Sequence, residues 1–310
     1  MMKKAVIIGG RGKVGSYLVP MLVSEGYEII NVSRGQTEAF VKNEAWEHVT
    51  QVSLDRNKPG FESEIRNLKA DVVVDMICFQ NEDMLRLVNA LRDSVTHYLV
   101  TGSAWMHGHS GVVPVLEDEC REPLEEYGIQ KSMMDKTLAQ EYTKNGFPGT
   151  AVHPGHIVCP GDIPINPQGF KSLSAFNKLK VGEPVYLPNF GMETLHHVHA
   201  EDVAGVFLAA INAGKPSFGQ GFHATSSRAV TLWGYAMEVA GWYGKQADLR
   251  FEPFDEWKNR VSEEEAAATF THISHSPSCS MEKAKRLLGF EPNHTSYEAI
   301  KECISSFGEI

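Results

Sequence analysis

Continuous apolar runs alternate with amphipathic stretches through the first half of the chain. The apolar runs have the length of strands, and the run Val72-Val73-Val74 is typical of a strand that helices cover on both faces. The expected strands are residues 5–8, 28–32, 49–53, 71–77, 98–101 and 150–153, and the expected helices are residues 14–24, 82–92 and 125–144. This alternation predicts an α/β fold built on a doubly wound parallel sheet.

The pattern changes near Pro160, where proline and glycine begin to interrupt the chain. Helical patterns return over residues 232–241 and 280–288. We therefore predict a first domain over residues 1–160 and a smaller lobe over residues 161–310. Residues 196–213 resemble a strand end that leads into a helix, and residues 221–225 a short strand. A segment over about residues 195–228 is thus expected to return to the sheet, which interleaves the lobes.

A glycine-rich loop follows the first expected strand and opens the first expected helix. Glycines allow the backbone to turn tightly and to approach a pyrophosphate, whose charge then lies at the helix N-terminus. A merely tight turn is the alternative, but the flanking strand and helix favour an NAD(P)-binding domain of the Rossmann type. The expected contacts with the cofactor are Gly9, Arg11, Gly12, Lys13, Val14 and Gly15.

The end of the second expected strand bears on which dinucleotide binds. It reads Asn31-Val32-Ser33-Arg34 and has no carboxylate for the ribose 2′-hydroxyl of NAD. Arginine accommodates a 2′-phosphate, so Ser33, Arg34 and Arg11 predict a preference for NADP(H). If Arg34 instead points into solvent, the site accepts either NADP(H) or NAD(H). Further cofactor contacts are expected from Asp55, Arg56, Ile77, Lys131 and His153.

Three residues carry the candidate chemistry. Tyr127 and Lys131 lie four residues apart on an expected helix, a spacing that helices also produce by chance. Ser103 follows the fifth expected strand, at the carboxyl edge where parallel sheets hold catalytic groups. Together with the glycine loop, these residues predict hydride transfer to or from a nicotinamide.

These residues, taken in order, resemble the landmarks of the extended short-chain dehydrogenase/reductase family, in particular its NAD-dependent epimerase/dehydratase branch. The landmarks are Gly9 to Gly15, Ser103, Tyr127-Gly-x-x-Lys131, His153-Pro154-Gly155 and His199-Ala-Glu-Asp202-Val-Ala. The resemblance implies that Tyr127 is the acid/base, that Lys131 lowers its pKa and holds the nicotinamide ribose, and that Ser103 binds the reacting oxygen. For catalysis at neutral pH, the pKa of the tyrosine must fall by roughly 3 units from its usual value of ~10.

Departures from the family pattern narrow the range of reactions and substrates to expect. Dehydratases of the family carry an Asp-Glu pair where this chain has Ala104-Trp105, so 4,6-dehydration is disfavoured. His153 replaces an arginine of many nucleotide-sugar enzymes, and His107 a common tyrosine. We expect an oxidoreductase or epimerase acting on a small or sugar-like carbonyl or alcohol. Trp105, His107 and His153 are the expected substrate contacts, with core or turn positions as the alternative.

A non-catalytic cofactor sensor or RNA-associated protein is the second hypothesis. Such relatives commonly lose the Tyr or the Lys, and this chain has both. Its formal charge of -10 also argues against nucleic-acid and membrane partners, which need clustered positive charge. Helices of this fold often pair into four-helix interfaces, so the resemblance also implies a homodimer.

Histidine and cysteine patterns predict no metal site. His196, His197 and His199 lie together, with His197 and His199 on one face of an expected strand, but without the spacing of a zinc motif. The five scattered cysteines form no C-x-x-C pair. The apolar run after Lys4 is too short for a signal peptide. We expect a cytoplasmic protein with reduced thiols.

Overall fold

A seven-stranded sheet forms the centre of the larger lobe in the computed structural model, which describes residues 2–35, 38–119 and 121–308. Cys120, one of the five cysteines, lies outside these ranges. The strand order is β11-β6-β5-β4-β1-β2-β3, and all neighbouring pairs are parallel. The strands are β1 (Lys4–Ile8), β2 (Glu28–Ser33), β3 (Thr50–Ser53), β4 (Val72–Asp75), β5 (His97–Thr101), β6 (Gly149–Pro154) and β11 (Gln220–Ala224). The predicted doubly wound fold is confirmed.

Helices cover both faces of this sheet. On one face, α1 (Gly15–Ser24) and α6 (Ala200–Ala213) pack together over a core that includes Leu18 and Phe207. The other face is covered by α2 (Phe61–Asn67), α3 (Asn81–Leu91) and α4 (Glu126–Asn145). This double cover explains why the central strands are continuously apolar.

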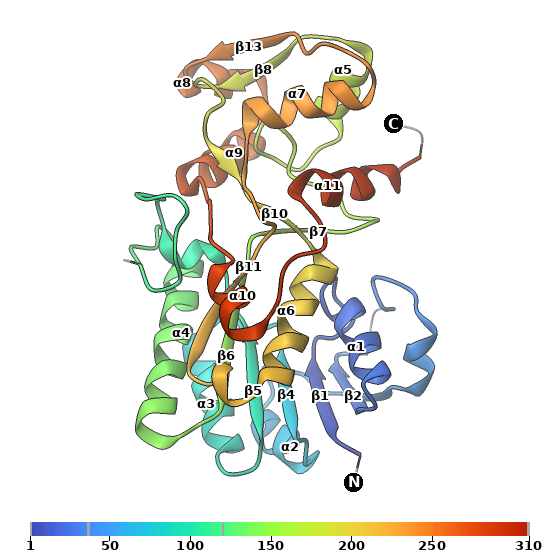
Figure 1. Ribbon diagram of the computed structural model, residues 1–310, viewed down its shortest axis with the longest axis vertical. Coiled ribbons are helices and arrows are strands. Elements are labelled where there is room, and N and C mark those ends of the chain that lie inside the picture. The colour runs from blue at the N-terminus through green and yellow to red at the C-terminus, as the bar shows by residue number, and fades with distance from the viewer. Residues whose placement is uncertain (1, 36–37, 120, 309–310) are drawn as a thin grey trace.

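The remaining elements, apart from α10 beside α6 and β11, form a smaller lobe above the sheet (Figure 1). The remaining elements are β7 (His156–Val158), α5 (Ser174–Val181), β8 (Val185–Pro188), β9 (Thr194–Leu195), β10 (His197–His199), β12 (Val230–Thr231), α7 (Leu232–Trp242), β13 (Leu249–Glu252), α8 (Phe254–Trp257), α9 (Glu263–His275), α10 (Glu282–Leu288) and α11 (Ser296–Ser305). Four short 3-10 helices complete the chain as described: η1 (Glu44–His48), η2 (Ala104–His107), η3 (Lys215–Ser217) and η4 (Lys258–Arg260). A separate core around Phe176, Leu187 and Tyr235 stabilises this lobe.

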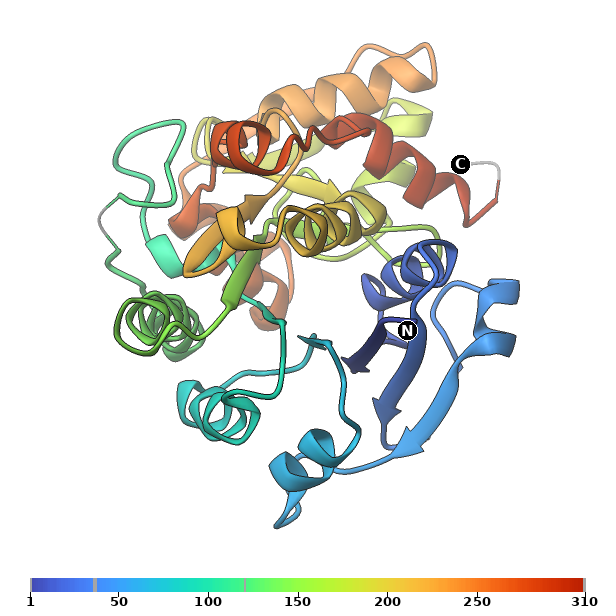
Figure 2. The ribbon, with the colours of Figure 1, turned by 60° about the horizontal axis from the view of Figure 1, so that its bottom comes forward.

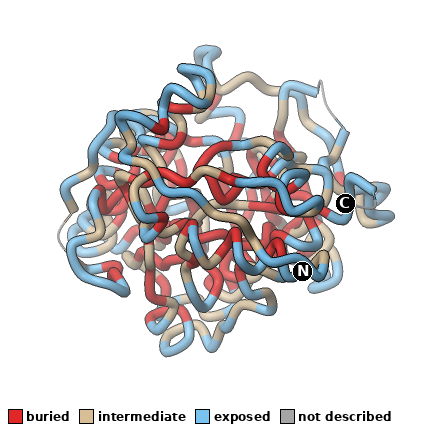
Figure 3. The backbone as a smooth tube through the Cα atoms, turned by 90° about the horizontal axis from the view of Figure 1, so that it is seen from above, coloured by how far each residue is buried: buried red, intermediate tan, exposed pale blue. Residues whose placement is uncertain are grey.

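The chain returns from the smaller lobe to the sheet. β11 pairs with β6, from which it is far apart in sequence, and the two lie side by side in Figure 2. Within the segment expected to return, over about residues 195–228, α6 covers the sheet and β11 joins it, whereas β10 pairs with β7 outside the sheet. Helix α10 also packs back against α6 and β11. Buried segments run through both lobes and exposed loops surround them (Figure 3).

One predicted strand is shorter than expected. Residues 71–77 were expected to be extended, but β4 ends at Asp75. The backbone N–H of Ile77 donates to Oδ1 of Asp75 at 3.3 Å, which turns the chain away from the sheet. Among the described residues, none of the helices has both the length and the apolar character to cross a membrane.

Candidate functional site

The glycine loop between β1 and α1 is closely packed. Gly9 has a φ of +82°, and a Cβ there would lie 2.7 Å from Cγ2 of Ile77. A Cβ on Gly15 would lie 2.3 Å from the carbonyl oxygen of Gly10. Contacts this short exclude any side chain, so the loop needs glycine at both positions.

A cavity of about 830 Å³ lies beside this loop. Its size is within the range of ligand pockets. Of the predicted cofactor residues, it is lined by Gly9, Arg11, Gly12, Ser33, Arg34, Asp55, Arg56 and Ile77. The remaining loop residues lie behind the wall, since Val14 is buried and the Lys13 ammonium pairs with Asp162.

Two charged residues change the expected character of this cavity. Arg56 forms a two-pronged ion pair with the fully buried Asp75, so its charge is neutralised within the wall. Glu38, which the sequence did not single out, lines the same cavity. The backbone N–H of Phe40 donates to the carbonyl oxygen of Arg11 at 3.0 Å and brings this segment over the loop. Because that contact is tertiary, no local sequence pattern predicts it.

Ser103, Tyr127 and Lys131 converge where β5 ends and α4 begins. The side chain of Ser103 caps η2 and interacts with the phenol of Tyr127. Tyr127 is 38 % exposed. Lys131 lies one turn further along α4 and is only 2 % exposed. Its Nζ is 5.5 Å from the centroid of the Tyr127 ring and donates to the carbonyl oxygens of Cys78 and Thr101, each at 2.6 Å.

The protonation of this group differs from the sequence-based expectation. Burial raises the pKa of Tyr127, and the hydrogen bond with Ser103 acts in the opposite direction. Burial also lowers the pKa of Lys131 to about 8, against the opposing effect of Cys78 and Asp75. Two carbonyls already engage the ammonium. The lowered tyrosine pKa that the resemblance implies is therefore not a property of these side chains alone.

Trp105 forms an aromatic wall next to Tyr127. The two ring centroids are 6.0 Å apart and nearly perpendicular, with an interplanar angle of 88°. From α9, His272 meets the indole at 5.7 Å and His275 stacks on it at 4.4 Å. The wall therefore combines residues from both lobes. Of the three predicted substrate contacts, Trp105 is the one beside the tyrosine.

His107 and His153 lie elsewhere than we expected. His107 is 4 % exposed, and its Nε2 is 2.9 Å from Nε2 of His223. His153 is fully buried, and its two ring nitrogens contact the backbone N–H of Ser103 and the carboxylate of Asp135. His153 therefore has no polar atom left for a cofactor or substrate. Both corrections arise because the imidazoles turn into the interior, which residue type and spacing do not reveal.

Gly128 within α4 has a packing reason. A Cβ there would lie 2.6 Å from the carbonyl oxygen of Trp105 and 3.0 Å from Cβ of Pro123. Close packing of η2 and of the chain before α4 therefore requires a glycine at this position.

The histidine cluster near β10 is hydrogen-bonded. Nε2 of His196 lies 2.9 Å from the carbonyl oxygen of Ser226, and Nε2 of His197 lies 3.1 Å from that of Ile165. Both imidazoles are fully buried. They tie β10 to neighbouring loops of the smaller lobe.

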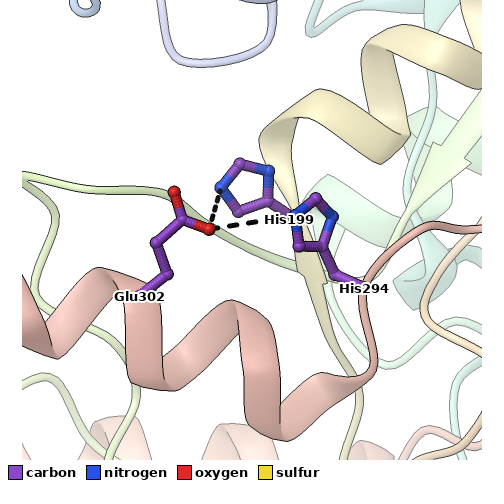
Figure 4. A group of neighbouring side chains, drawn as sticks. All are labelled: His199, His294 and Glu302. Carbon is purple, nitrogen blue, oxygen red and sulfur yellow. Dashed lines mark ion pairs between the residues drawn. The ribbon is translucent and has the colours of Figure 1, made fainter.

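Figure 4 shows His199, His294 and Glu302, whose donor atoms lie within 4.8 Å of one another. Glu302 Oε2 is 3.7 Å from Nε2 of His199 and 3.8 Å from Nε2 of His294. However, Nδ1 of His199 accepts the backbone N–H of Glu201 at 3.2 Å. The neutral ring then carries its proton on Nε2, the atom that a metal would need. The cluster is therefore arranged to join β10 to α11 rather than to bind a metal ion.

The part of the chain that carries the cavity, the glycine loop and Ser103, Tyr127 and Lys131 matches the model of a known family. The model of the NAD dependent epimerase/dehydratase family matches residues 5–219. The chain belongs to this family. The epimerase/dehydratase match spans every strand of the central sheet except β11.

Two curated relatives resemble this epimerase/dehydratase chain at low identity. The chloroplast stem-loop binding protein of 41 kDa b of Arabidopsis thaliana is 25 % identical over 323 residues, which cover 97 % of this chain and 78 % of that protein. The 2′-dehydrokanamycin reductase of Streptomyces kanamyceticus is 26 % identical over 224 residues, which cover 72 % of this chain and 62 % of that protein.

Solved structures share the fold. UDP-glucose 4-epimerase from Thermotoga maritima, solved with UDP-glucose, superposes with a TM-score of 0.73 at 18 % identity and covers 98 % of both chains. UDP-glucuronic acid 4-epimerase from Bacillus cereus, solved with UDP-glucuronic acid and NAD, gives a TM-score of 0.70 at 15 % identity, also over 98 % of both chains. At these identities the similarity concerns the fold alone.

Proposed function

We propose that the protein is an NAD(P)-dependent oxidoreductase or epimerase that transfers hydride at a carbonyl or alcohol carbon of a small or sugar-like substrate. The observation that carries this proposal is the convergence of Ser103, Tyr127 and Lys131 next to the cavity beside the glycine loop. Phe79 joins the two sites, because it lines the cavity and its ring lies 5.2 Å from Nζ of Lys131.

Each residue has a distinct role in the proposed reaction. In the oxidative direction, Tyr127 takes the proton of the substrate hydroxyl, and a bound nicotinamide would supply the hydride acceptor; reduction would reverse both transfers. Ser103 hydrogen-bonds the reacting oxygen. Lys131 holds the nicotinamide ribose and adds positive charge near the phenol. An epimerase returns the hydride to the opposite face of the same carbon.

We further propose that NADP(H) binds more tightly than NAD(H). Arg11 and Arg34 both line the cavity, and guanidinium groups bind phosphate in a bidentate manner. Lys42 lines a neighbouring hollow of about 630 Å³ that shares Arg11 and Glu38 with the cavity. Glu38 opposes this preference, since a carboxylate repels the 2′-phosphate. Asp55 and Asp83 also line the cavity, so the proposed preference rests on the bidentate binding of a 2′-phosphate by Arg11 and Arg34 rather than on net charge.

The aromatic wall supports a sugar-like substrate. Trp105 is partly exposed beside Tyr127 and is backed by the buried His275, and aromatic faces pack well against the apolar faces of a sugar ring. We propose that the smaller lobe, over about residues 161–310, supplies the rest of the substrate site. The four residues of η2 (Ala104–His107) include no carboxylate, so 4,6-dehydration is not part of the proposed activity.

The test combines cofactor titration with a substrate panel. NADPH and NADH are titrated by fluorescence, and UDP-glucose, UDP-galactose, simple keto sugars and 2′-dehydrokanamycin are offered with either cofactor. Nicotinamide absorbance detects net oxidation or reduction, and sugar chromatography detects epimerisation. Tyr127→Phe should keep cofactor affinity and lose nearly all turnover, whereas Tyr142→Phe at the other end of α4 should keep both. Full turnover by Tyr127→Phe would show that the Tyr127 hydroxyl takes no part in the mechanism. Failure of the wild-type protein to bind either cofactor would overturn the proposal.

A second candidate follows from the Arabidopsis relative, whose name describes stem-loop binding and whose match spans 97 % of this chain. Under this second candidate function, the protein binds a nucleic-acid stem-loop. An RNA hairpin in a mobility-shift assay distinguishes the two candidates. A shift that weakens steeply with salt would support stem-loop binding. No shift at micromolar protein would exclude it, which is the result expected from the formal charge of -10.

A further inference from the structure

A chain of buried polar groups lies behind Ser103. The backbone N–H of Ser103 donates to Nδ1 of His153 at 3.2 Å, and Nε2 of His153 lies 2.9 Å from Oδ1 of Asp135. The other carboxylate oxygen of Asp135 pairs with Arg121, whose guanidinium also donates to the carbonyl oxygen of Glu117 at 2.6 Å. The proposed proton transfer uses none of these side chains.

The proton positions in this chain are determined by the donors. A backbone N–H can only donate, so Nδ1 of His153 must hold a lone pair. The neutral ring therefore carries its proton on Nε2, which donates to Asp135. Burial lowers the pKa of His153, against the opposing effect of Asp135, in keeping with a neutral ring. His153 is fully buried and Asp135 is 8 % exposed, so water does not compete for these bonds.

Two glycines make room for the His153–Asp135 pair. A Cβ on Gly102, directly before Ser103, would lie 2.1 Å from Nδ1 of His153. A Cβ on Gly221 of β11 would lie 2.1 Å from Oδ1 of Asp135 and 2.7 Å from Nε2 of His153. Any larger residue at either position would displace the pair. Backbones from β11 and from the loop after β5 thus enclose it.

We propose that Arg121, Asp135 and His153 form a positioning relay that fixes the backbone of Ser103, so that its hydroxyl meets Tyr127 and the reacting oxygen. This inference rests on the proposed function for the role of Ser103. The Ser103 hydroxyl also accepts the N–H of Trp105 at 3.1 Å, so the start of η2 sets the side chain once the backbone is held. Misplacement by about 1 Å is enough to cost a catalytic group on the order of a hundred-fold in rate.

Two substitutions of His153 separate its two hydrogen bonds. In His153→Asn, the amide oxygen reaches the position of Nδ1 and keeps an acceptor for Ser103, while the bond to Asp135 is lost. In His153→Gln, the amide nitrogen reaches the position of Nε2 and keeps the donor to Asp135, while the N–H of Ser103 loses its acceptor. A purely structural role predicts similar losses in both variants.

The first readout needs no substrate. Amide hydrogen exchange of Ser103, measured by NMR, should accelerate at least about ten-fold in His153→Gln and much less in His153→Asn, because the unpaired N–H loses its protection. In a pH titration followed by NMR of ¹³Cζ-labelled tyrosine, the titration midpoint of Tyr127 should shift in His153→Gln in the same direction as in Ser103→Ala. Equal exchange rates in the two His153 variants would overturn the relay.

The second readout is turnover of the panel substrate that the wild-type protein converts. His153→Gln should lower kcat about ten-fold or more and leave KM nearly unchanged, whereas His153→Asn should stay within a few-fold of wild type. In the Ser103→Ala background, His153→Gln should not lower kcat any further. An additional fall in kcat there would contradict the relay. If Ser103→Ala alone keeps full kcat, the proposed role of Ser103 fails, while the amide exchange still decides whether His153 holds its backbone.

Discussion

Trp105 and His275 stack with their ring centroids 4.4 Å apart and their planes 14° from parallel. Trp105 comes from η2, directly after β5, whereas His275 is the last residue of α9 in the smaller lobe. The wall beside Tyr127 is therefore complete only when the two lobes are correctly placed.

This stack leads to a prediction for His275→Ala. Removing the imidazole takes away an aromatic pair worth about 0.5–1.5 kcal/mol and loosens the indole beside Tyr127. We expect KM for the converted substrate to rise roughly five-fold with a smaller change in kcat, measured by steady-state kinetics. His48→Ala, at an exposed position in η1, serves as the control and should change neither constant. An unchanged KM in His275→Ala would mean that the wall does not meet the substrate.

Cofactor choice is expected to depend on two exposed residues of opposite charge in the cavity wall, Arg34 and Glu38. Arg34→Ala should weaken NADPH binding roughly ten-fold or more and leave NADH binding almost unchanged, because a charged hydrogen bond contributes about 1.5–3 kcal/mol. Glu38→Ala should strengthen NADPH binding. Fluorescence titration measures both, with Lys178→Ala on α5 as the control. Tighter binding of NADH than of NADPH by the wild-type protein would reverse the assignment.

Acid stability should depend on Asp135. Burial alone would raise the pKa of this carboxyl group, but the hydrogen bond from His153 and the Arg121 guanidinium hold it well below its usual range. Because the folded-state pKa is lower than the unfolded value of about 3.9, the stabilisation is complete above that pH and is lost as the pH falls below it. Asp135→Asn should cost roughly 3 kcal/mol at pH 7, since it leaves Arg121 without its partner.

Urea unfolding between pH 7 and pH 3 checks this. The difference in free energy of unfolding between wild type and Asp135→Asn should be constant down to about pH 4 and then narrow. Asp255→Asn, at a fully exposed position, should show no comparable loss. A difference that persists unchanged to pH 3 would argue against an ionised Asp135 in the folded protein.

Two glycines should respond oppositely to alanine. Gly221→Ala places a methyl group against Asp135 and His153, and we expect it to destabilise the protein by about 2–3 kcal/mol. Gly241→Ala lies within α7 with no atom within 4 Å of the new carbon, so it should stabilise by up to about 1 kcal/mol. Thermal unfolding compares the two variants. A neutral Gly221→Ala would show that the relay can shift without cost.

The central fold was predictable because its strands are continuously apolar and its helices are amphipathic over their whole length. The positions of the glycine loop and of Ser103, Tyr127 and Lys131 were predictable because they follow expected strands or share one helix; the chemistry proposed for them stays a prediction. Glu38 was missed because its place in the cavity depends on the contact between Phe40 and Arg11. His153 was predicted to contact a ligand, yet it is buried against Asp135, whereas Arg56 lines the cavity as predicted but is paired with the buried Asp75; tertiary packing decides both contacts.

Strand β11 has a consequence for cotranslational folding. It occupies the sheet position next to β6, yet its residues, Gln220–Ala224, are synthesised long after Gly149–Pro154 of β6. While the intervening residues are still being made, the nascent chain exposes one edge of β6 with unpaired backbone groups, a template for misassociation. Gly221 also arrives only with β11, so the pocket around His153 and Asp135 closes late in synthesis. A ribosome stalled before residue 220 would therefore carry an incomplete sheet and an open pocket around His153 and Asp135.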